Sequence, residues 1–194
     1  MRPKLSLQGR ALALLALREH SPAELRRKLH RHARAEAVQA AVAAVAAACS
    51  PFDAPDDAAL AEAADAIDEA AVAARLDGLI DWLRAHSYLS EERFIESRVH
   101  ARASRYGQMR IRQELAQHGL TLGDEAAQAL RNSEVERAAE VLARKFPQAP
   151  ATAAERARQA RFLAGRGFAA DVIARLIRRR ENHRRDADGD DSCV

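Results

Sequence analysis

The chain of 194 residues has few aromatic, cysteine, glycine and proline residues. Five Phe, two Tyr and one Trp cannot build one large aromatic core, so each structural element must bury its apolar side against its neighbours. Cys49 and Cys193 provide neither a disulfide framework nor metal-ligand spacing. No apolar run approaches the roughly 20 residues that a membrane span needs. These absences argue against a disulfide-rich secreted scaffold and a membrane-spanning protein.

The first residues, Met1-Arg-Pro-Lys, lead into an amphipathic segment and not into a uniformly apolar one. This start predicts no secretory signal peptide. We therefore expect a cytoplasmic protein.

Charge is distributed unevenly along the chain, although its formal sum is only +3. Residues 1–35 hold nine Lys or Arg against Glu19 and Glu24, whereas residues 36–72 hold eight acids and no Lys or Arg. The sequence is thus a basic scaffold interrupted by an acidic segment.

Helix signals dominate and strand signals are absent. Ser21-Pro22-Ala23-Glu24 and Ser133–Glu136 have the form of capping boxes, Ser90 is a further N-cap candidate, and Gly119 is placed to end a helix. Apolar periodicity and these signals predict helices over about 5–19, from 21 onward, 35–49, 56–86, 90–106, 108–118, 121–131, 133–146, 152–164 and 170–181, with breaks at 50–55 and at Gly107. The charged segment after residue 181 is predicted to be disordered.

Two distant segments, 21–29 and 107–115, repeat the same pattern of a turn or cap, branched apolar residues four apart and basic residues between them. A looser copy covers 161–168. Such self-similarity is typical of helical repeat proteins, which commonly bind elongated partners. The chain is therefore predicted to be all-α, an elongated array of three tandem three-helix units.

The first unit is longer than the other two. Leu115–Gly119 aligns with Leu163–Gly167 at an offset of 48 residues, whereas Leu29 aligns with Leu115 at an offset of 86. The surplus of about 38 residues matches an alanine-rich acidic stretch, which we interpret as an insertion, either a helical hairpin or a flexible filler. The expected units are 1–86 with the insertion at about 35–72, 87–132 and 133–181, followed by a disordered tail over 182–194.

Four motifs in this order carry a family resemblance: Glu24-Leu-Arg-Arg-Lys-Leu29, Asp81–Phe94, Tyr106–Leu115 with Gly119, and Arg161–Ile173. The chain resembles the RecX family of bacterial recombination regulators over about 5–30 and 76–180. The resemblance implies tandem three-helix repeats that bind the RecA nucleoprotein filament in its helical groove and restrain ATP hydrolysis, strand exchange and coprotease activity. The acidic insertion, and Gln108-Met109 in place of a proline-containing turn, depart from the family pattern.

Arginine is concentrated between residues 93 and 112, a segment that contains six arginines and one acidic residue, Glu96. Arg98, Arg102 and Arg105 are expected to share one helix face beside Tyr106, which suits phosphates or an acidic protein groove. An ordinary solvated face is the alternative for this group, for a second group near residue 26 and for a third near residue 178. The candidate partner- and DNA-binding residues are Arg26, Arg27, Lys28, Arg98, Arg102, Arg105, Tyr106, Arg110 and Arg112.

No Walker motif, nucleophile elbow or zinc pattern occurs, so we expect no catalytic residues, no metal and no cofactor. The expected partners are the RecA filament and, weakly on its own, single- and double-stranded DNA. A direct helical nucleic-acid-binding protein and a helical scaffold for another protein remain the alternatives, which charge alone does not separate.

Overall fold

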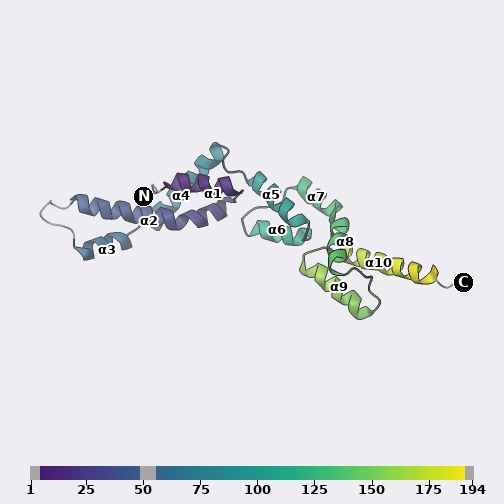
Figure 1. Ribbon diagram of the computed structural model, residues 1–194. Helices are drawn as coiled ribbons and strands as arrows, with labels where there is room; N and C mark the ends of the chain where they lie inside the picture. Colours follow the sequence, from purple (N-terminus) through teal and green to yellow (C-terminus); the bar gives the residue numbers. More distant parts are fainter. Residues whose placement is uncertain (1–4, 49–55, 191–194) are drawn as a thin grey trace. The chain divides into compact units, whose positions relative to one another are not determined.

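The computed structural model describes residues 5–48 and 56–190, with side chains as far as Arg184. Over these residues the chain forms ten α-helices and no β-strand, which confirms the all-α prediction (Figure 1). The helices are α1 (Leu7–Leu17), α2 (Pro22–Ala48), α3 (Asp57–Asp65), α4 (Glu69–Ala85), α5 (Glu91–Ala103), α6 (Gln108–Ala116), α7 (Asp124–Asn132), α8 (Glu134–Lys145), α9 (Ala153–Gly165) and α10 (Ala170–Asp190). The chain divides within α5 into two compact units, one ending at Phe94 and one beginning at Ile95. None of the described helices is long and apolar enough to cross a bilayer.

The first unit is built around an apolar core shared by α1, α2 and α4. Leu25 and Leu29 of α2 and Leu76 and Ile80 of α4 are at most 1% exposed. Their spacing of four residues places each pair on one helix face. Because α2 begins at Pro22, with the Glu24 amide donating to Ser21 Oγ at 3.1 Å, the predicted N-terminal cap is confirmed.

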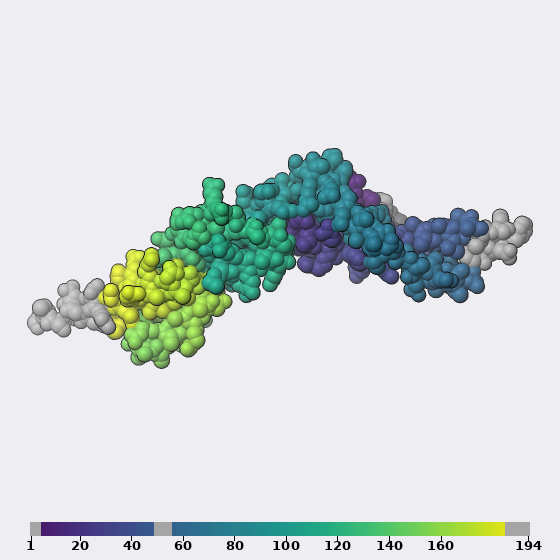
Figure 2. Space-filling model, turned by 180° about the vertical axis from the view of Figure 1, so that it is seen from behind, coloured from purple at the N-terminus to yellow at the C-terminus, as the bar shows by residue number. Residues whose placement is uncertain are grey.

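The second unit has its main core between α8, α9 and α10, which pack on one another (Figure 2). Leu142, Leu163 and Leu176 each come from a different one of these helices and are at most 3% exposed. On α6, Ile111 and Leu115 are fully buried in the same way as Leu25 and Leu29. The predicted buried positions of the first two repeat segments are therefore confirmed.

Two glycines end equivalent helices with the same backbone bonds. Gly119 and Gly167 have φ values of 72° and 78°, and the amides after them donate to Leu115 O at 3.0 Å and to Leu163 O at 3.3 Å. This is a Schellman-type helix end, which favours glycine in the left-handed conformation. The alignment of Leu115–Gly119 with Leu163–Gly167 thus has a shared structural cause.

The first repeat segment lacks this ending, because Ala33 occupies the position that corresponds to Gly119. Helix α2 therefore runs on from Leu29 to Ala48 without a turn. Its extension packs along α3, so the described part of the insertion has the arrangement of a helical hairpin (Figure 1). No residue of α3 is buried, which fits its alanine-rich sequence.

Three predictions about element boundaries need correction. The segments from 21 and over 35–49 form one helix, α2, because no residue breaks it. The single helix predicted over 56–86 is two helices, α3 and α4, and Asp68 caps the second by accepting from Ala70 N at 2.8 Å. The predicted disordered tail from 182 is helical as far as Asp190, because it extends a helix that is already formed and does not have to be nucleated. Some predictions fall outside the described residues: the break at 50–55, the roles of Cys49 and Cys193, and the end of the tail. The boundaries proposed for the three units remain a prediction.

Candidate partner-binding surface

The start of α6 is held by residues far away in the sequence. The amides of Gly107 and Met109 donate to the carbonyl oxygens of Arg166 and Gly167 at 3.0 and 3.2 Å. The amide of Gln108 donates to Glu134 Oε1 at 3.0 Å. Three amides that a helix start leaves unpaired are thereby satisfied by the turn after α9 and by α8. We call this contact the joint.

Arg137 of α8 binds backbone carbonyl groups next to the joint, at the end of α5, in the turn after it and in α7. Arg137 donates to the carbonyl oxygens of Ala103 at 3.0 Å, Tyr106 at 2.8 Å and Leu130 at 2.8 Å. Burial lowers the pKa of the Arg137 guanidinium from its usual value, and nearby Glu134 opposes this effect. A cation at a helix C-terminus also complements the helix dipole. Arg137 is therefore a structural residue of the joint.

Two further arginines bind the same turn and remain near the surface. Arg144 Nη2 donates to Ser104 O at 2.9 Å, and Arg166 Nη1 donates to Arg105 O at 3.1 Å. The Arg166 guanidinium also lies over the Phe162 ring, 4.5 Å from its centroid. These bonds fix both side chains while leaving several of their N–H groups available.

The predicted arginine face of α5 is only partly formed. Helix α5 ends at Ala103, so Arg105 lies in the following turn and not on the helix face with Arg98 and Arg102. Arg102 Nε pairs with Glu114 Oε2 at 2.9 Å, and its guanidinium lies 5.7 Å from the centroid of the Tyr106 ring. The three arginines are thus not equivalent, because the helix is shorter than predicted and ends before Arg105.

The two candidate arginines of α6 lie on opposite edges of its buried side. Arg110 and Arg112 flank the buried Ile111, and both are exposed. Side chains two residues apart on a helix point in different directions. Within the described chain neither arginine pairs with a carboxylate. Both are therefore available to a partner, although they do not form one patch.

The candidate cations of α2 are partly neutralised within the first unit. Arg26 pairs with Asp77, and Lys28 Nζ lies 3.3 Å from Glu24 Oε1. Arg27 is exposed and has no carboxylate partner among the described residues. From the insertion, Glu69 pairs with nearby Arg34 at 2.8 Å. Of the three candidates in this group, Arg27 is the one left available.

Glu24 is a buried carboxylate that the sequence indicated only as a capping residue. Burial alone would raise the pKa of this carboxyl, but hydrogen bonds from Arg18 and Lys28 outweigh it and lower the pKa to about 2. The buried His20 ring lies beside these three residues. Its Nδ1 atom is 2.8 Å from Arg18 O and its Nε2 atom is 3.0 Å from Lys28 Nζ. Burial lowers the pKa of His20, and these two contacts suit a neutral ring.

The Glu24 carboxylate predicts an acid dependence of stability in the first unit. Because its folded pKa lies below its unfolded value near 4.5, its contribution is complete above pH 4.5 and disappears as the pH falls toward 2. We expect Glu24→Gln to lower the unfolding free energy by about 2 kcal/mol at pH 7 and by nearly nothing at pH 2. Denaturant titrations followed by fluorescence of Trp82, the single tryptophan, measure this. Glu36→Gln, which removes a surface pair with Arg75, is the control; an equal effect of both variants at pH 7 contradicts the assignment.

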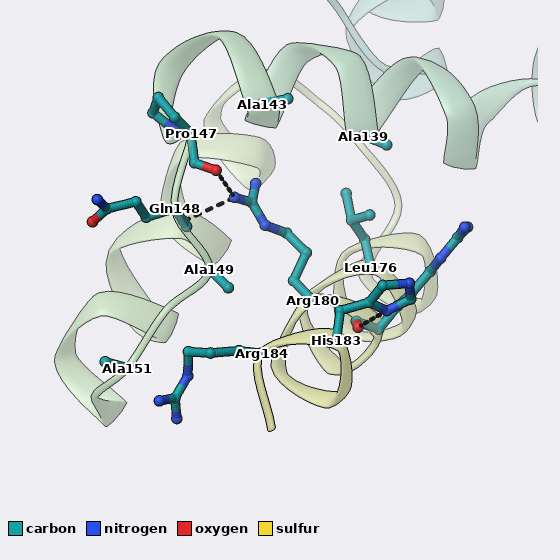
Figure 3. Close-up of a pocket in the computed structure, with 11 residues that line it drawn as sticks. Ala139, Ala143, Pro147, Gln148, Ala149, Ala151, Leu176, Arg180, His183 and Arg184 are labelled. Atoms are coloured by element: carbon teal, nitrogen blue, oxygen red, sulfur yellow. Dashed lines mark hydrogen bonds between the residues drawn. The ribbon is translucent and has the colours of Figure 1, made fainter. Parts of the chain in front are cut away.

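The third basic group, on α10, contains one arginine with a structural role. Arg180 Nη2 donates to the carbonyl oxygens of Phe146, Pro147 and Gln148 at 2.6, 3.2 and 2.8 Å. Figure 3 shows this side chain directed at the loop after α8. Arg180 thereby holds the α8–α9 loop against α10, whereas Arg175, Arg178 and Arg179 are exposed.

Sequence reasoning missed the residues that build the joint: Glu134, Arg137, Arg144 and Arg166. The capping box predicted over Ser133–Glu136 is wrong, because the Ser133 side chain makes no cap bond to α8 and instead donates to Ala129 O at 3.0 Å. No local pattern indicates contacts across 26 to 61 residues. Gly107 and Gly167 also approach each other closely, but the repeat pattern equates Gly167 with Gly119 and does not indicate this contact.

Family models and curated relatives that match this chain carry the same family name. The family models described as RecX, second three-helix domain, and RecX, third three-helix domain, match residues 90–130 and 132–177. The chain is 41% identical over 179 residues to a Regulatory protein RecX from Leptothrix cholodnii, covering 91% of this chain and 90% of the relative. It is 41% identical over 179 residues to a protein of the same name from Ralstonia nicotianae, covering 91% and 89%. A third, from Pseudomonas putida, is 48% identical over 107 residues, covering 53% of this chain and 68% of that protein.

Proposed function

Because the chain belongs to the RecX family, we propose that it binds the RecA nucleoprotein filament and inhibits its ATP hydrolysis, strand exchange and coprotease activities, thereby regulating recombination and DNA repair. The observation that carries this proposal is the identity of 41% across nine-tenths of the chain with proteins named Regulatory protein RecX. In this proposal the protein acts by binding, in the cytoplasm, and has no catalytic residues of its own.

The described surface supports binding through charge more than through a large apolar patch. Its exposed large apolar side chains are Leu5, Leu17, Tyr88 and Met109, which are spread along the sequence. In contrast, Arg27, Arg105, Arg110 and Arg112 are exposed cations. Exposed cations of this kind complement a polyanionic filament and speed association with it.

The direct test is the ATPase activity of RecA on single-stranded DNA with and without this chain. We expect the rate to fall as the chain is added, and to fall less at high salt because screening weakens the charge contacts. An unchanged ATPase rate at saturating chain concentration would contradict the proposed function.

Arg110 and Arg112 give a residue-level prediction. We expect Arg110→Ala together with Arg112→Ala to raise the concentration needed for half-inhibition about tenfold, since two charge contacts of roughly 0.5 to 1 kcal/mol each are lost. Both side chains are exposed, so helicity measured by circular dichroism should not change. The matched control removes two other exposed arginines, Arg161→Ala with Arg178→Ala. Equal losses in both double variants would show that only net charge matters.

Direct nucleic-acid binding is the second candidate function, because α6 and the turn before it carry exposed arginines without carboxylate partners in the described chain. The candidate DNA-binding residues of the second unit are Arg98, Arg102, Arg105 and Tyr106. Those of the first unit are Arg26, Arg27 and Lys28. This function predicts binding of the chain to DNA in the absence of RecA, with a strong salt dependence.

A further inference from the structure

A cationic hollow of about 380 Å³ lies at the joint within the second unit. Its lining includes Arg105 and Tyr106 from the turn after α5, Arg144 and Lys145 from α8, and Phe162 and Arg166 from α9. None of the lining residues is acidic, and the nearby carboxylate of Glu140 is 3.9 Å from Arg144 Nη2 and mostly exposed. We call this hollow the joint pocket.

The cations of the joint pocket differ in how firmly they are held. Arg144 and Arg166 are anchored on the carbonyl oxygens of the α5 turn, so their guanidinium groups are placed before any ligand arrives. Arg105 and Lys145 are exposed, and within the described chain neither pairs with a carboxylate. Two anchored and two exposed cations around one hollow provide a site where an oxyanion gains charge-assisted hydrogen bonds, and the two anchored cations need little further ordering.

One wall of the joint pocket is aromatic and partly apolar. Arg166 lies over both rings, with its guanidinium carbon 4.5 Å from the Phe162 centroid and 5.9 Å from the Tyr106 centroid. Both rings are half-buried, so part of this wall faces the hollow. Nucleobases stack on aromatic rings and on guanidinium planes alike.

We propose that the joint pocket binds one nucleotide unit of single-stranded DNA, with Arg105, Arg144 and Lys145 on the phosphate and the Tyr106, Phe162 and Arg166 wall against the base. This inference deepens the proposed function by naming a site at which the chain contacts the DNA strand directly. The volume lies at the small end of ligand pockets, which suits one nucleotide. An acidic peptide without aromatic residues offers carboxylates for the cations but no ring to stack on this wall, whereas every nucleotide carries both a phosphate and a base, so the combination favours a nucleotide.

The test uses the full chain without RecA and a fluorescently labelled 15-mer of thymidylate, titrated at several salt concentrations. Arg105→Ala with Lys145→Ala should weaken binding about tenfold and flatten the salt dependence by about 0.7 for each phosphate no longer neutralised. Arg161→Ala with Arg178→Ala, which removes the same charge outside the pocket, should change the affinity less than about twofold. Equal weakening by both double variants would overturn the site.

The base wall is tested with a matched abasic strand and with Tyr106→Leu. Wild-type chain should bind the abasic strand about tenfold more weakly than the thymidylate strand, and Tyr106→Leu should reduce that preference. Equal binding of both strands by the wild type, or equally strong competition by a 15-mer of polyglutamate, would overturn the nucleotide assignment. This binding assay contains no RecA, so a negative result contradicts the nucleotide site but not the proposed inhibition of RecA. Likewise, an unchanged RecA ATPase rate would contradict the proposed inhibition but not the nucleotide site.

Discussion

Gly107→Ala is expected to destabilise the second unit by about 3 to 5 kcal/mol. A Cβ atom at Gly107 would overlap the carbonyl group of Gly167 and the Cα of Phe168, which are backbone atoms that no side-chain rotation can move. Relieving the overlap must separate α6 from the turn after α9, and that lengthens the bonds from Gly107 N and Met109 N. The expected loss combines overpacking of 1 to 3 kcal/mol with about 1 kcal/mol for each of the two hydrogen bonds.

Gly123→Ala is the matched control for this prediction. Gly123 also precedes a helix, has a similar φ of −62° against −76° for Gly107, and has no atom within 4 Å of an added Cβ. Both substitutions change the intrinsic N-cap preference alike, so this change should cost only about 1 kcal/mol or less. Hydrogen exchange of the α6 and α9 amides measures the difference. Similar protection in the two variants would contradict the role of the joint.

Truncating the equivalent core leucines is expected to cost about 2 to 5 kcal/mol at each position. Leu29 and Leu115 are fully buried and occupy the same place in two repeat segments, so Leu→Ala loses the transfer free energy of the side chain and leaves a cavity. Trp82 fluorescence reports unfolding of the first unit for Leu29→Ala. Amide exchange in α6 reports local opening of the second unit for Leu115→Ala.

Met109→Ala provides the comparison on the same helix as Leu115. Its side chain is 64% exposed, so the substitution should cost less than about 0.5 kcal/mol. Losses below 1 kcal/mol at both Leu29 and Leu115 would contradict their placement as equivalent core positions. The two units should respond separately, since each has its own apolar core.

Most of the helices and the repeat pattern could be predicted from the amino-acid sequence, because both depend on nearby residues. Apolar residues four apart predicted which sides of α2 and α6 are buried, and Ser21 with Pro22 predicted where α2 begins. The predicted ending at Gly119 follows from its freedom to adopt a positive φ. The absence of glycine at the equivalent Ala33 is also visible in the sequence, and it explains why α2 continues into the insertion.

Which charged residues are structural and which are available to a partner depends on contacts between distant parts of the chain. Arg102, Arg105 and Arg137 look alike in the sequence, but one pairs with Glu114, one is exposed and one is half-buried against carbonyl oxygens of the α5 turn. The reason is physical: an arginine is neutralised or held by groups that the chain brings near it, and at the joint these groups lie tens of residues away. Helix periodicity predicts a face, whereas the bonds that a face makes depend on what packs against it.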